Sequence, residues 1–220
     1  MNMRLGIYEI FSRIVPGGFY LVAIVQFLIA VGLVKIDWQT INNVSLIVSL
    51  GLIVACYILG EAFDRIALVW FRMFKKPGFS ARSFAEFKKN HQDRWKIDFK
   101  ENDWPILLAF IRTKNLELAG EIERHNALSI MLRNVSVGLL LMAINSLIEL
   151  FISRNIIYMG IALILLVVSI LIIYESMKFR GWFYSGIYET VIAYRINLED
   201  SIKPVRNSSR LSKVKIQDED

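Results

Sequence analysis

The fold is decided by residues 133–174, which read RNVSVGLLLMAINSLIELFISRNIIYMGIALILLVVSILIIY. Two apolar runs, Val135–Ile152 and Ile156–Ile173, flank three polar residues at positions 153–155. Each run has the length that a helix needs to cross a hydrocarbon core of about 30 Å. In lipid the backbone must satisfy its own hydrogen bonds, which favours helices. We therefore predict a transmembrane helical hairpin over 135–174.

Upstream of this hairpin, two more apolar runs predict two further spans. The first covers about 19–36, and the second covers about 44–64 in a helix that continues to Phe74. Before them, 1–15 has apolar positions at spacings of three and four, which indicates a short amphipathic helix in the membrane interface. Pro16-Gly17-Gly18 is expected to break that helix and turn the chain into the first span.

Polar segments make up the rest of the chain. We predict a cytoplasmic helical block over 75–134, with helices at 80–89, at 104–112 and from Asn115 into the third span. Within it, 95–99 alternates like a strand or an extended strap, and Asp103 is placed to cap the helix that follows. An aromatic-rich cytoplasmic helix is predicted over 175–200, followed by a disordered tail over 201–220.

Composition agrees with a multi-pass membrane protein that has an aqueous part. The 220 residues are 55% hydrophobic and 21% charged, with a mean hydropathy of +0.46. Of the 26 Lys and Arg residues, only Lys35 and Arg154 fall in the two short loops on one side of the predicted bilayer. Because positive charge stays inside, both termini and the middle block are expected in the cytoplasm. The one cysteine, Cys56, excludes a disulfide within the chain and is read as a packing residue.

Two polar residues of the third span, Asn145 and Glu149, are candidate intramembrane sites. Polar groups at that depth are costly and normally face protein or water. One alternative is a ring of Asn145 and Glu149 that lines a pore in an oligomer. The favoured alternative is an interhelical hydrogen bond from Asn145, with Glu149 reaching the outer interface beside Arg154.

A second candidate is the juxtamembrane charge cluster Glu61, Asp64 and Arg65. Glu61 and Arg65 are spaced for an ion pair between residues i and i+4 of one helix. We favour a cluster that fixes the helix at the headgroup level over a proton or ion site.

Glu117, Glu121 and His125 are spaced four apart, which puts them on one helix face. Carboxylates and an imidazole could bind a divalent metal, but one helix offers too few ligands, so we favour a salt-bridged stalk and predict no metal site. The chain also has no phosphate-binding loop, dinucleotide fingerprint, zinc-protease motif or nucleophile elbow. We therefore predict a protein that is not an enzyme and that carries no cofactor.

Basic side chains concentrate over 88–100 and mark a candidate docking surface. The residues are Lys88, Lys89, Arg94, Lys96 and Lys100. For such a segment we favour anionic lipid headgroups. The alternatives are an acidic protein partner and, less favoured, nucleic acid.

Several short motifs resemble those of four-span bacterial membrane proteins that accompany antiphage and CRISPR systems, such as the Kiwa membrane subunit. They are YEIFSRIVPG at 8–17, LGE at 59–61, EIER at 121–124 and the later Arg133-Asn134. The resemblance implies a sensor or effector in the inner membrane of a bacterium that works with a soluble cytoplasmic partner, and it assigns no functional residues.

Together these observations predict an all-α, four-span membrane protein with a cytoplasmic helical module. Because one copy has little surface hidden from lipid in which to bury its polar groups, we expect a homo-oligomer. The predicted function is a non-enzymatic sensor, effector or adaptor subunit of antiphage defence that docks a soluble partner. The alternatives are a homo-oligomeric pore that permeabilises the membrane and, less favoured, a membrane-embedded enzyme or transporter.

Overall fold

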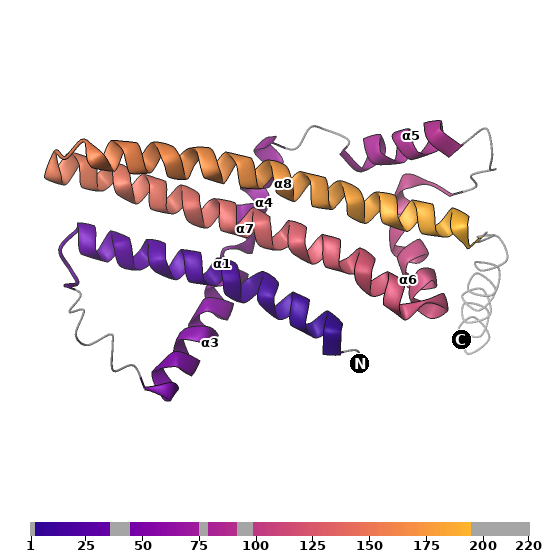
Figure 1. The fold of residues 1–220 in the computed structure, drawn as a ribbon, viewed down its shortest axis with the longest axis horizontal. Helices are drawn as coiled ribbons and strands as arrows, with labels where there is room; N and C mark the ends of the chain where they lie inside the picture. The colour runs from indigo at the N-terminus through magenta and orange to yellow at the C-terminus, as the bar shows by residue number, and fades with distance from the viewer. Residues whose placement is uncertain (1–2, 36–44, 75–78, 92–98, 195–220) are drawn as a thin grey trace, which may run out of the picture. The chain divides into compact units, whose positions relative to one another are not determined.

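A computed structural model describes residues 3–35, 45–74, 79–91 and 99–194, and these ranges contain helices and no strand. The predicted all-α class is confirmed for them. The helices, in chain order, are α1 (Met3–Ala30), α3 (Leu46–Ala62), α4 (Asp64–Phe74), α5 (Phe79–His91), the 3₁₀ turn η1 (Glu101–Asp103), α6 (Trp104–Lys114), α7 (Leu116–Ser153) and α8 (Ile157–Ala193) (Figure 1). The predicted strap lies mostly, and the predicted tail wholly, outside the described residues.

Three of the described helices, α1, α7 and α8, are long and apolar enough to cross a membrane. The pair α3 and α4 passes the same test only when the two helices are taken together, and they meet at a bend of 46°. α7 and α8 have 38 and 37 residues, about 55 Å each at 1.5 Å per residue. Each is therefore much longer than the thickness of a hydrocarbon core.

The helical hairpin is present where it was predicted. α7 ends at Ser153 and α8 begins at Ile157, and the two helices lie side by side in opposite directions (Figure 1). Arg154 takes a left-handed backbone conformation with φ of 55°, and the side-chain oxygen of Asn155 accepts a hydrogen bond from the Ile157 N–H at 3.1 Å. Three residues thus reverse the chain and begin the new helix.

Small residues form the seam between α7 and α8. Ser136 and Ser169 each donate a hydroxyl hydrogen bond to the other's carbonyl oxygen, at 2.9 and 2.7 Å. Ser129 and Ser176 repeat this exchange at 2.9 and 2.8 Å. The serines of each helix are seven residues apart, so they recur on one face. The seam satisfies buried hydroxyls between the helices without needing water.

The predicted break at residues 16–18 is wrong, because α1 is continuous through Pro16. Proline removes only the hydrogen bond to the carbonyl of Ser12, which a long helix tolerates. Gly17 serves a helix crossing instead: a methyl group at this position would overlap the backbone carbonyl of Cys56 on α3. Gly60 of α3 meets the backbone of Arg13 in the same way. Two glycines thus bring α1 and α3 into backbone contact.

α1 also ends six residues before the predicted end of the first span. Gly32 has φ of 74°, and its N–H bonds to the Ile29 carbonyl while the Leu33 N–H bonds to the Leu28 carbonyl. These two hydrogen bonds form a Schellman motif, which ends a helix at a left-handed glycine. The apolar sequence continues past this point, but the helix does not.

A second correction concerns the helix that was predicted to run unbroken to Phe74. It bends by 46° between α3 and α4, at Phe63. The two parts have different neighbours: α3 crosses α1, whereas Trp70 of α4 donates a hydrogen bond to Ser136 on α7 at 3.0 Å. Phe71 of α4 packs with Ile173 of α8. The bend lets one segment contact both sets of helices.

The chain divides into two compact units. Unit 1 comprises Met1–Phe79 and Gly120–Phe183, and unit 2 comprises Ser80–Ala119 and Tyr184–Asp220, of which the structure describes residues up to 194. The predicted cytoplasmic block of 75–134 with 175–200 overlaps unit 2. However, 120–134 and 175–183 belong to unit 1, and the predicted separate helix from 175 is a continuation of α8.

The glycine crossing predicts unequal effects for two neighbouring substitutions. Gly17→Ala should destabilise unit 1 by about 1–3 kcal/mol, because the added methyl group meets backbone that cannot move aside. Gly18→Ala is the matched control: it has open space and should be neutral or stabilising, since alanine favours helix. Thermal unfolding of both variants in detergent measures the difference, and equal midpoints would contradict the crossing.

Candidate functional site

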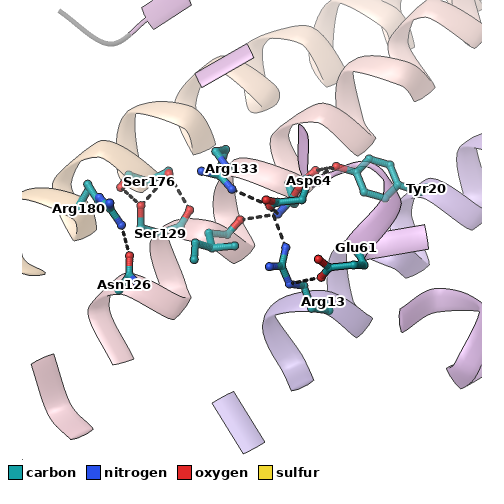
Figure 2. Close-up of polar contacts among 11 residues, drawn as sticks. Arg13, Tyr20, Glu61, Asp64, Asn126, Ser129, Arg133, Ser176 and Arg180 are labelled. Atoms are coloured by element: carbon teal, nitrogen blue, oxygen red, sulfur yellow. Dashed lines mark hydrogen bonds and ion pairs between the residues drawn. The ribbon is translucent and has the colours of Figure 1, made fainter. Parts of the chain in front are cut away.

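Four charged side chains converge inside unit 1 where α1, α3, α4 and α7 meet (Figure 2). Asp64 of α4 forms ion pairs with Arg13 of α1 at 2.9 Å and with Arg133 of α7 at 2.6 Å. Glu61 of α3 pairs with Arg13 at 3.0 Å. We call Arg13, Glu61, Asp64 and Arg133 the charge cluster. Two positive and two negative charges balance, which lowers the cost of removing them from water.

Two neutral side chains, those of Asn134 and Tyr20, form hydrogen bonds next to Asp64, the inner carboxylate of the charge cluster. The Asn134 amide donates to Asp64 at 2.9 Å and to the Ile130 carbonyl at 3.0 Å. Tyr20 of α1 donates its hydroxyl to the Asn134 carbonyl oxygen at 2.9 Å, and its ring stacks on Phe63 at 4.5 Å. Tyr20 and Asn134 are fully buried. Tyr20 thus links the hydrogen bonds around Asp64 to the apolar contact between α1 and the bend at Phe63.

The two acids of the charge cluster, Glu61 and Asp64, were predicted from the sequence. The predicted base, Arg65, is not the one that pairs with them. Arg65 is exposed, and Glu61 pairs with Arg13 in its place. The expected spacing of i and i+4 does not apply, because the helix bends at Phe63 between the two residues. Arg13 and Arg133 were not identified from the sequence as the ion-pair partners of these acids. Tyr20 and Asn134, whose hydrogen bonds support them, were not identified either. The available signal was that Arg13 and Arg133 also flank apolar runs at the same predicted membrane face.

Asn145 makes a contact within the chain. It is buried, and its amide donates to the Ala23 carbonyl oxygen of α1 at 2.6 Å. One residue further, Ser146 accepts a hydrogen bond from Gln26 at 3.2 Å. α7 therefore contacts α1 through polar groups along the length of the interface. Glu149 is half-buried, and its carboxylate has no ion-pair partner among the described residues.

The candidate docking surface lies in unit 2 and is described only in part. Lys88 and Lys89 end α5 with exposed side chains, and Lys100 is exposed where η1 begins. Arg94 and Lys96 lie outside the described residues. Asp103 does not cap α6 with its side chain as predicted; its carboxylate accepts from the Lys100 N–H at 2.7 Å.

An aromatic core supports these basic residues. Tyr188 of α8 is fully buried, and its ring lies 5.3 Å from Phe84, 5.4 Å from Phe87 and 5.8 Å from Phe99. Its hydroxyl donates to the Glu101 carbonyl at 3.2 Å. Aromatic rings bury large areas with few rotatable bonds. Unit 2 therefore has its own small core, which holds α5 with its lysines outward.

Glu117, Glu121 and His125 all lie on α7. The His125 ring contacts the rings of Phe179 and Trp182 on α8, at 6.2 and 5.9 Å. Next to it, Asn126 accepts a hydrogen bond from Arg180 of α8 (Figure 2). In the part of the chain that the structure describes, no group of three His, Cys, Asp or Glu side chains could hold a metal ion.

Comparison of the chain with protein-family models, curated proteins and solved structures finds no match. The resemblance to membrane proteins of antiphage systems therefore stays a prediction.

From the charge cluster we predict that its two acids contribute unequally to the stability of unit 1. Asp64→Asn should destabilise unit 1 by about 3 kcal/mol, because it leaves Arg13 and Arg133 with Glu61 as the one remaining acid of the charge cluster. Glu61→Gln is the matched control and should cost at most about 1 kcal/mol, since the Glu61 side chain is 59% exposed, against 25% for Asp64. Thermal unfolding in detergent compares them. A larger loss for Glu61→Gln would show that the cluster is organised differently.

Proposed function

We propose that this protein is a non-enzymatic subunit of the bacterial inner membrane, a sensor or adaptor that docks a soluble cytoplasmic protein. The proposal is carried by one observation: unit 2 has an aromatic core of its own and exposes Lys88 and Lys89 in the last turn of α5. Because α7 and α8 continue along the chain from unit 1 into unit 2, a partner bound to unit 2 would be held at the membrane. Antiphage defence, the setting we propose, rests only on the resemblance of short motifs.

The proposed topology has four spans with both termini in the cytoplasm. Contacts within unit 1 support alternating directions: α1 and α7 are parallel, because Tyr20 meets Asn134 and Gln26 meets Ser146. α3 is antiparallel to α1, since Gly17 lies at Cys56 and Gly60 lies at Arg13. With α3 and α4 taken as one span, four alternating helices return the chain to its starting side. The excess of Lys and Arg on that side then favours the cytoplasm.

The second candidate is the homo-oligomeric pore, which one observation favours. Glu149 is half-buried without an ion pair among the described residues, as a carboxylate facing a shared aqueous axis would be. Asn145 gives this candidate less support, because its amide already bonds to Ala23. We propose a homo-oligomer in either case, in which another copy would cover part of the exposed apolar surface of α3.

Co-expression with the neighbouring genes and purification in mild detergent tests the docking function. We expect a soluble protein to co-purify, and Lys88→Glu with Lys89→Glu to release it by reversing two exposed charges. The matched control is Lys114→Glu with Arg124→Glu, which reverses two exposed charges on α6 and α7 and should retain the partner. A protein that purifies alone as a symmetric ring, and whose conductance is lost in Glu149→Gln, would replace the adaptor with the pore.

The topology is tested by labelling single cysteines in intact cells with a membrane-impermeant maleimide. In a Cys56→Ser background, Asn155→Cys in the hairpin turn should react from outside the inner membrane. Asn90→Cys on α5 should react only after the membrane is opened. The reverse pattern would invert the proposed orientation.

A further inference from the structure

The two sides of α4 differ in what they contact. Its inner side packs within unit 1: Phe71 contacts Ile173 and Met177 of α8, and Ala67 packs with Tyr20 and Val137. Asp64, the only acid of α4, is also turned inward, where it pairs with Arg13 and Arg133. The helix is thus fixed against its neighbours by both apolar and charged contacts.

The outer side of α4 carries an apolar row beside a basic row. Ile66, Val69 and Met73 are 53%, 60% and 72% exposed and follow helical spacing, so they lie next to one another. Arg65 and Arg72 are exposed and seven residues apart, which puts them on one side of this row, about 10 Å apart along the axis. Neither arginine has a partner among the described residues.

We propose that the outer side of α4 is a binding site for anionic phospholipid. The apolar row would enter the acyl-chain region while the two arginines hold phosphate groups, the arrangement of an interfacial amphipathic helix. Guanidinium groups suit phosphate because they donate two parallel hydrogen bonds. The inference rests on the proposed membrane crossing of α3 and does not depend on a soluble partner.

Charge and position favour lipid over a protein occupant. Because Asp64 is neutralised inside the charge cluster, the outer side of α4 has a charge of +2 with no exposed acid to offset it. The 46° bend turns α4 away from the line of α3 immediately after the charge cluster. A helix that bends where a span meets the headgroups would lie where anionic lipids attract basic residues.

The test measures which lipids stay bound to the full-length protein. The protein is reconstituted in phosphatidylcholine with a minor fraction of phosphatidylglycerol, extracted in mild detergent and examined by native mass spectrometry. We expect phosphatidylglycerol to be enriched over its share of the bilayer. Arg65→Gln with Arg72→Gln should lower that enrichment at least about tenfold, since two cations near an anionic surface contribute up to roughly 30-fold.

Two further variants separate lipid binding from other causes. Arg82→Gln with Lys114→Gln removes two exposed charges from unit 2 and should leave the enrichment unchanged. Val69→Ser with Met73→Ser should reduce retention of both lipids without changing their ratio. The proposal is overturned if the arginine variant keeps the wild-type enrichment, if both double charge variants lose it equally, or if the serine variant instead dissociates two copies of the chain. If no soluble protein co-purifies but phosphatidylglycerol is still enriched, the docking function is contradicted and the lipid site is not.

Discussion

The arrangement of unit 1 depends on where the carboxylate of Asp64 lies. It is held between Arg13 of α1 and Arg133 of α7, and Asn134 donates a third contact to the same oxygen atom. A carboxylate that is partly withdrawn from water must keep its counter-charges close, so this one residue fixes three helices relative to the bend. The bend in turn decides which side of α4 faces inward and which side is left exposed.

Helix contacts in unit 1 combine this ionic contact with close backbone approach. Gly17 and Gly60 bring α1 onto α3, and paired serines bring α7 onto α8. Such contacts suit helices in lipid, where apolar side chains gain little by moving from lipid to protein and packing must supply the association. Unit 2 is held differently, by aromatic rings around Tyr188. The two units are therefore held together by different kinds of contact.

Helix length, the hairpin turn and a helix cap were predictable because each depends on residues that are close together in the sequence. The lengths of the apolar runs and the polar turn at 153–155 predicted the hairpin, and Asn115 does cap α7, accepting a hydrogen bond from the Leu118 N–H at 3.0 Å. Partners distant in sequence were not predictable: Asp64 and Arg133 are 69 residues apart. Gly17 was read as a turn residue because its contact with α3 leaves no local pattern. The paired serines did leave one, since the pairs are placed symmetrically about the hairpin turn.

A double-mutant cycle between Arg13→Gln and Asp64→Asn measures how strongly the Asp64 carboxylate couples α4 to α1. The cycle compares the unfolding free energies of the wild type, both single variants and the double variant in one detergent. If the carboxylate joins the helices through Arg13, the two substitutions should couple by about 1 kcal/mol or more. Strictly additive effects would contradict the account, because they would mean that the two side chains do not interact in the folded protein.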